Sequence, residues 1–184
     1  MFRAILVLSG VAILLASAPA APVPKHLMKD EPLYFPITVG TKWEHDPGGS
    51  YEVTKVEDKD GGKLVTVAGG FGGPVVWHVS RSGLSMVSFA LGAFDPPTPM
   101  LRLPVADKKK WETLAGKGDV VKGLFTAHGP EDVEIKAGKF RAIRVELEWV
   151  GYNKCTVWYA PGIGEVKSIN DGRARELKSF TPGK

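Results

Sequence analysis

The sequence predicts an all-β domain, a single antiparallel and strongly curved sheet of ten or eleven strands that forms a half-barrel or barrel. Three observations support this prediction. Apolar and polar residues alternate in short stretches, turn signals recur about every ten residues, and no helical period follows residue 20. Consecutive strands without intervening helices favour a curled antiparallel sheet, and a sandwich fits the same pattern.

Residues 1–20 have the pattern of a secretory signal peptide. Arg3 supplies a positive charge, residues 4–16 are almost entirely apolar, and Ala18-Pro19-Ala20 offers small residues for cleavage. The apolar run is shorter than the roughly 20 residues that a membrane-spanning helix needs. We therefore expect a protein that is exported to the periplasm or beyond the cell and does not span the membrane.

The rest of the chain divides into a short lead-in and one domain. Residues 21–33 are rich in Pro and charge and are expected to be extended, and residues 34–184 are expected to form the single β domain. The expected strands are 50–58, 63–68, 75–80, 84–90, 111–116, 119–128, 132–136, 140–150, 154–160, 165–169 and 173–180.

Local sequence supports this strand assignment. Asp60-Gly61 is a hairpin turn, because Asp and Gly tolerate positive φ. Residues 140–150 alternate most clearly between an apolar and a charged face, as a half-buried strand does. Residues 92–104 contain four prolines, which remove backbone donors, so we expect a long crossover or edge loop there.

Two stretches, residues 35–44 and 103–112, are alike. Both begin with an apolar residue, Pro and a second apolar residue, and both end in Lys-Trp-Glu. The matching anchors are Pro36 and Pro104, and Trp43 and Trp111. Neither copy contains a nucleophile beside a base or a metal-ligand cluster. We interpret this internal repeat as architecture, two equivalent starting points of a curved sheet in which each Trp buries about 150–250 Å².

Three motifs carry a family resemblance, at residues 34–43, 137–145 and 158–167. Their order resembles exported bacterial proteins of unknown function of the DUF3108 and TapB-like type, which are similar in architecture to the LolA/LolB lipoprotein carriers. The resemblance implies a curved sheet that can hold acyl chains, and it carries over no catalytic residue. Its residues and those of the repeat are structural: Pro36, Gly40, Trp43, Pro104, Trp111, Gly138, Phe140, Pro161, Gly162 and Gly164.

Composition and motifs argue against several classes of function. The formal net charge of +4 is small and interleaved with acidic residues, so we expect no nucleic-acid partner. The four histidines, His26, His45, His78 and His128, do not have metal-ligand spacing. The single cysteine, Cys155, sits in a strand pattern typical of a small buried hydrophobe. We expect no catalytic residue, metal or cofactor, and a hydrolase using His78 or Cys155 is the least favoured hypothesis.

Large apolar side chains on the expected strands are the best candidates for a binding site. The candidate ligand-lining residues are Trp77, Met86, Phe125, Trp149 and Trp158. If the curved sheet leaves a cavity, they would bind an apolar molecule such as a lipid or acyl chain. If the core is filled, the protein is instead a cell-envelope interaction or scaffold module with a protein partner. A cavity of several hundred cubic ångströms would favour the first hypothesis over the second.

Overall fold

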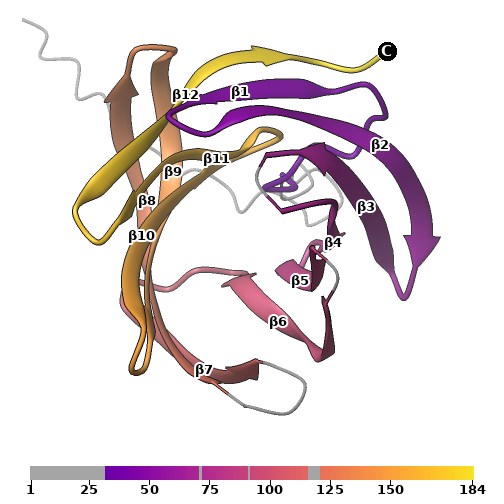
Figure 1. Ribbon diagram of the computed structural model, residues 1–184. Coiled ribbons are helices and arrows are strands. Elements are labelled where there is room, and N and C mark those ends of the chain that lie inside the picture. The colour runs from indigo at the N-terminus through magenta and orange to yellow at the C-terminus, as the bar shows by residue number, and fades with distance from the viewer. Residues whose placement is uncertain (1–31, 71, 91, 116–120) are drawn as a thin grey trace, which may run out of the picture. The chain divides into compact units, whose positions relative to one another are not determined.

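The computed structural model describes residues 32–70, 72–90, 92–115 and 121–184. The predicted signal peptide, residues 1–20, and residues 21–31 of the predicted lead-in lie outside the described residues. Every regular element of the described chain is a β-strand (Figure 1). The all-β prediction is confirmed, and the expected ten or eleven strands are corrected to twelve.

The strands are β1 (Lys42–Asp46), β2 (Gly49–Lys59), β3 (Gly62–Gly69), β4 (Val75–Ser80), β5 (Gly83–Phe89), β6 (Gly92–Arg102), β7 (Lys109–Ala115), β8 (Val121–Ile135), β9 (Gly138–Trp149), β10 (Asn153–Ala160), β11 (Gly164–Asn170) and β12 (Arg173–Thr181). They form one antiparallel sheet in the order β6-β5-β4-β3-β2-β1-β12-β11-β10-β9-β8-β7. The pairing of β1 with β12 joins its two halves, from Lys42 opposite Thr181 to Asp46 opposite Glu176.

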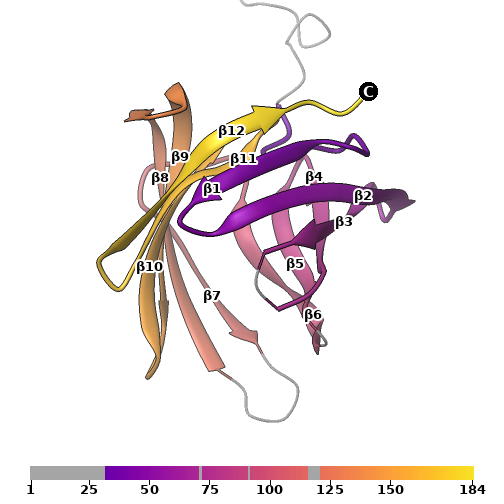
Figure 2. The same ribbon diagram turned by 45° about the horizontal axis from the view of Figure 1, so that its top comes forward.

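The sheet curls on itself until its two edge strands, β6 and β7, face each other across a gap (Figures 1 and 2). The result is a nearly closed barrel, as the sequence predicts. We call this gap the seam. It separates two strands that are consecutive in sequence, and the connection at residues 103–108 crosses it.

The strand β6 corrects the expectation of a loop at residues 92–104. Pro96, Pro97 and Pro99 all lie in β6. Proline is tolerated in an edge strand, because the ladder on one side is absent and the missing N–H is not required there. A second correction concerns the expected strands 119–128 and 132–136, which are one strand, β8, with a bulge between His128 and Pro130.

The core lies on the concave face of the sheet. Inward-facing side chains alternate with outward-facing ones along each strand, as the period of two requires. The largest fully buried apolar side chains are Phe125, Leu84, Leu101, Ile143, Leu177, Val53, Val65, Val79, Val145 and Val166.

The two copies of the repeated stretch occupy corresponding places. Trp43 lies in β1 and Trp111 in β7, the first strands of the two six-strand halves, and both are buried. Each indole stacks on the aromatic ring opposite it in the next strand. Trp43 lies 6.1 Å from Tyr51 with an interplanar angle of 16°, and Trp111 lies 5.1 Å from Phe125 with an angle of 14°. This placement agrees with an architectural role for the repeat, which stays an interpretation.

Successive turns of an antiparallel meander lie at opposite ends of the barrel. The last residues of β1, β3, β5, β7, β9 and β11 lie at one end, which we call the open end. The turns after β2, β4, β8 and β10 and the 103–108 connection share the other, which we call the closed end. The site described below lies at the open end.

Residues preceding β1 fill the closed end. Phe35 is buried, and its ring lies 5.8 Å from Trp43 and 5.4 Å from Trp77. The carbonyl oxygen of Leu33 accepts a hydrogen bond of 2.7 Å from the backbone N–H of Gly162. Leu33, which the sequence placed in the lead-in, is therefore part of the packed structure.

Candidate functional site

An apolar cavity of about 720 Å³ lies at the open end of the barrel. It is bounded by β5 and β6 on one side of the seam and by β7 to β11 on the other. The described residues that line it are Met86, Phe89, Phe94, Thr98, Met100, Ala115, Val121, Trp149, Tyr152, Asn153 and Asn170. Its size is within the roughly 300–1,000 Å³ typical of small-molecule sites.

Strand register places the β4, β5 and β6 side chains of this region in one inward row. Trp77 is opposite Met86, and Met86 is opposite Thr98. Thr98 is only 1% exposed, and its Oγ1 makes no hydrogen bond to any described residue. The row runs from the aromatic core under Phe35 to the cavity wall.

A glycine shapes the opposite wall. Gly123 on β8 is opposite Trp149 on β9, and both face inward. A Cβ atom at Gly123 would lie 2.7 Å from Trp149 Cζ3 and 2.8 Å from Phe125 Cε2. The absent side chain therefore lets both rings lie over β8. The Phe125 ring packs edge-on against Trp149 at 5.8 Å, beneath the cavity surface.

The structure brings two of the five predicted ligand-lining residues to this cavity, Met86 and Trp149. Phe125 lies beneath the wall and is only 2% exposed, and Trp77 packs on Phe35. Trp158 faces the opposite side of the sheet, where its indole N–H donates a 2.7 Å hydrogen bond to Glu131. Trp158 therefore does not line the cavity.

Sequence reasoning missed most of the remaining cavity residues. Phe94, Thr98 and Met100 lie in the Pro-rich stretch that was expected to be a loop, so their faces were not assigned. Had the prolines been interpreted as markers of an edge strand, Phe94, Thr98 and Met100 would have been assigned to a sheet. Tyr152 lies in the turn after β9 and Asn153 begins β10, where alternation does not yet indicate a face.

Exposed apolar side chains occur at the open end, and two of them, Phe89 and Tyr152, line the cavity. Phe89, Leu114, Val150 and Tyr152 are large hydrophobic residues with substantial exposure, reaching 75% for Tyr152. All four lie at or near strand ends of the open end, and we call them the apolar rim. Such clustering on a protein surface marks a place where apolar molecules or surfaces make contact.

A polar cluster lies on the inner face near the turn between β1 and β2. The Arg175 guanidinium donates to Glu165 Oε1 at 2.8 Å and to the Tyr51 hydroxyl at 3.0 Å. His45 is buried, and its Nε2 lies 3.0 Å from the Glu165 carbonyl oxygen. Because a carbonyl only accepts, Nε2 is the protonated nitrogen, and Nδ1 makes no hydrogen bond to a described residue.

Burial controls the protonation of this cluster. Desolvation lowers the pKa of His45, partly offset by Glu165. Burial, reinforced by the Glu165 carboxylate, raises the pKa of Cys155 to about 11. Desolvation alone would lower the pKa of Arg175, but Glu165 and Tyr51 raise it above its ordinary value. At neutral pH the cluster therefore contains a neutral imidazole, a protonated thiol and a paired guanidinium.

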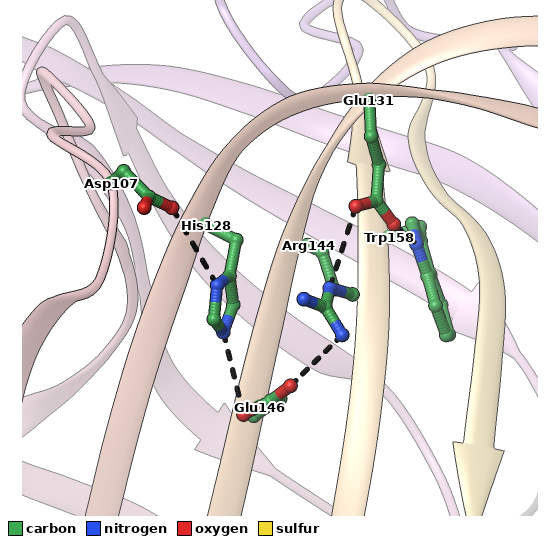
Figure 3. A network of polar contacts seen from close by, with 6 residues as sticks. All are labelled: Asp107, His128, Glu131, Arg144, Glu146 and Trp158. Atoms are coloured by element: carbon green, nitrogen blue, oxygen red, sulfur yellow. Dashed lines mark hydrogen bonds and ion pairs between the residues drawn. The ribbon is translucent and has the colours of Figure 1, made fainter.

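A second polar network lies on the outer face (Figure 3). The His128 ring lies between Asp107, at 3.7 Å from Nδ1, and Glu146, at 3.4 Å from Nε2. Arg144 donates to Glu146 at 2.9 Å and lies 3.5 Å from Glu131. These contacts tie the 103–108 connection to β8 and β9. Because His128 and Arg144 each contact two carboxylates, we interpret the network as structural.

Neither residue of the hydrolase hypothesis has an activated setting. The raised pKa of Cys155 keeps its thiol protonated, whereas a catalytic cysteine needs a thiolate. The Nε2 of His78 lies 3.1 Å from the carbonyl oxygen of Lys59. Among the described residues, no three His, Cys, Asp or Glu side chains are grouped to hold a metal ion.

Comparison with known proteins gives a likeness of fold only. Two crystal structures are similar to this chain. One is a candidate lipoprotein from Parabacteroides distasonis ATCC 8503, with 14% identity, a TM-score of 0.46 and coverage of 83% of this chain and 100% of that chain. The other is a candidate exported protein with a YmcC-like fold from Bacteroides fragilis NCTC 9343, with 15% identity, a TM-score of 0.45 and coverage of 82% and 99%.

No family model matches the chain, and no curated protein matches it. The predicted resemblance to the DUF3108 and TapB-like families is therefore not confirmed and stays a prediction. Within residues 32–184, as far as they are described, no helix has the length and hydrophobicity to cross a membrane.

Proposed function

We propose that the protein binds a lipid or another long apolar molecule in the cavity at the open end. The cavity itself supports the proposal most directly, because it leaves about 720 Å³ unfilled between apolar walls. The opposite end is filled by Phe35 and its neighbours, so the barrel is a cup rather than a channel.

The hydrophobic contribution of a buried lipid chain is large enough to give measurable binding. Each buried CH₂ group contributes about 0.8 kcal/mol, so eight methylenes contribute about 6 kcal/mol before the costs of association. Met86 and Met100 add adaptable walls, since the thioether side chain fills irregular gaps. This combination favours chains of variable shape over one rigid ligand.

The alternative, a scaffold module with a filled core, has less support. What favours binding over a scaffold role is the lining of this cavity, which is mostly apolar. The feature that favours a protein partner is the pair of edge strands at the seam, because an unpaired edge can accept another strand. In β6 that edge contains three prolines, which limit such pairing.

We also propose that the protein is exported, on the strength of the signal-like pattern in residues 1–20. Expression of the full chain in a bacterium, fractionation, and intact mass measurement test this. A periplasmic protein whose mass begins at Ala21 supports export, and a cytoplasmic protein that retains Met1 contradicts it.

Binding is tested with N-phenyl-1-naphthylamine, an uncharged probe that fluoresces in apolar surroundings. The protein purified without detergent is expected to bind it with micromolar affinity. Val121→Trp places an indole in the cavity and should abolish the signal. Val76→Trp, on the outer face of β4, should leave it unchanged.

Native mass spectrometry of the same preparation provides the second readout. An adduct of lipid mass that disappears after organic extraction supports the proposal. Failure to bind the probe, together with a bare polypeptide mass after incubation with lipid, would move the assignment to the scaffold module.

A further inference from the structure

The cavity is apolar, but its wall contains one hydroxyl without a hydrogen-bond partner. Thr98 on β6 faces inward beside Met86, is only 1% exposed, and its Oγ1 bonds to no described residue. A buried hydroxyl without a partner carries a desolvation cost that either a ligand or a bound water can offset. A hydroxyl placed in a ligand-sized cavity is therefore a candidate recognition group.

The charge of the lining restricts which ligand group Thr98 could meet. No Lys, Arg, Asp or Glu is found among the described residues that line the cavity. A charged head group buried there would lose its hydration without a counter-charge, which is strongly unfavourable. The described lining therefore favours a neutral group in the cavity.

The inward-facing cation on β12 does not change this conclusion. Arg175 is held by Glu165 at 2.8 Å and by Tyr51 at 3.0 Å. Its charge is already matched by a carboxylate, so it offers no free cation to an anionic lipid. Capture of a carboxylate or phosphate by Arg175 would require this ion pair to break.

The remaining polar groups of the wall are also neutral. The Asn153 side chain donates to Asn170 Oδ1 at 2.8 Å, linking β10 to β11 at the open end. Amide and hydroxyl groups hydrogen-bond to alcohols, esters and amides without requiring charge. Thr98, Tyr152, Asn153 and Asn170 are all uncharged and can hydrogen-bond to such groups.

We propose that the cavity selects amphiphiles whose buried polar group is uncharged, such as long-chain alcohols, esters or amides, and that Thr98 hydrogen-bonds to that group. This inference rests on the proposed lipid-binding function and specifies its ligand class. Thr98 is a specificity-determining residue in this scheme, and the apolar walls supply most of the affinity.

The test compares three probes of equal chain length, dodecane, 1-dodecanol and dodecanoate, as competitors of N-phenyl-1-naphthylamine at about pH 8. The wild-type protein should bind dodecanol about fivefold more tightly than dodecane, the effect of one net hydrogen bond. Dodecanoate, ionised at this pH, should compete more weakly than dodecanol.

Thr98→Val removes the hydroxyl and keeps the shape of the side chain. It should weaken dodecanol binding about fivefold and leave dodecane binding unchanged. Thr126→Val, a matched change on the outer-facing side of β8, should change neither. The thermal midpoint of unliganded T98V should equal or exceed that of wild type, since the variant loses an unpartnered hydroxyl.

The outcomes separate the two proposals. If the wild-type protein does not bind N-phenyl-1-naphthylamine, the proposed function fails and the ligand class fails with it. If the probe binds but T98V retains the full preference for dodecanol, only the inference about Thr98 is overturned. Tighter binding of dodecanoate than of dodecanol would overturn the preference for a neutral group.

Discussion

The indole N–H of Trp111 donates a hydrogen bond of 3.0 Å to the carbonyl oxygen of Pro99. Trp111 lies in β7 and Pro99 in β6, so this bond crosses the seam. The Arg102 guanidinium lies 5.9 Å from the Trp111 ring centre and adds a second contact between the same strands. A side chain thus joins two strands that share no backbone ladder.

Trp111→Phe should loosen the seam. Phe can keep the stack on Phe125 but cannot donate to Pro99, so we expect a loss of unfolding free energy about 1 kcal/mol larger than for Trp43→Phe. Trp43 is the matched control, since it is equally buried and stacks in the same way on Tyr51. Urea unfolding gives the stabilities. Hydrogen exchange should accelerate in β6 and β7 of W111F alone, and equal exchange in both variants would contradict a seam bond.

The thiol of Cys155 should be nearly inert in the folded protein. Burial raises its pKa to about 11, so the reactive thiolate is scarce at pH 8. Because alkylation requires the thiolate, iodoacetamide should react on the order of 100-fold more slowly than with a free thiol of pKa near 8.5. In urea the rate should return to that of a model thiol. A native rate close to the denatured one would show that Cys155 is neither buried nor desolvated.

Stability should fall as the solution is acidified through the unfolded pKa of His45. Folding lowers this pKa below 6.5, mainly by desolvation, so the unfolded chain binds the proton more readily. The contribution is present above about pH 6.5 and declines as pH falls towards the folded value, by at most about 1.4 kcal/mol per pH unit.

His45→Gln removes this titration and keeps a donor for the Glu165 carbonyl. The difference in urea midpoint between about pH 7.5 and pH 5 should therefore shrink relative to wild type. His78→Gln is the control, because His78 also lies near a backbone carbonyl but is less buried. An H45Q variant with the wild-type pH profile would exclude His45 as the source.

Alanine substitutions at Gly83 and Gly151 distinguish the cost of a steric clash from the cost of backbone strain. Both have positive φ, 131° and 83°. A Cβ at Gly83 would collide with the Leu101 carbonyl oxygen of the neighbouring strand, whereas a Cβ at Gly151 would meet nothing within 4 Å. Gly151→Ala should cost about 1 kcal/mol from strain, and Gly83→Ala should cost at least about 3 kcal/mol. Equal losses in thermal unfolding would contradict the close approach of β5 and β6.

The sequence predicted the fold class because its strongest signals are local. Alternation in residues 140–150 and turns such as Asp60-Gly61 depend on neighbouring residues only, and both correspond to strands and a turn of the structure. The strand β6 was missed because its prolines oppose a strand in local terms. Its place at the seam, a tertiary fact, makes those prolines acceptable.

The candidate site was less accessible to prediction than the fold. Met86 and Trp149 were identified from type and position, since large apolar residues on strands must face a core or a cavity. Trp158 has the same type but faces outward, where Glu131 and Lys167 accommodate it. The cavity itself depends on how far the sheet curls, and no short stretch of sequence determines that curvature.

The ladder between β1 and β12 has a consequence for how the chain can be divided. Within the described sheet, every other ladder joins strands that are consecutive in sequence. A cut in the 103–108 connection would therefore break no ladder and yield two six-strand fragments. They would meet along the β1–β12 edge, through the contact of Leu33 with Gly162 and through the bond from Trp111 to Pro99 across the seam. We therefore expect that two separately made polypeptides, divided at this connection, would reassemble into the same sheet and restore the cavity that the two halves share.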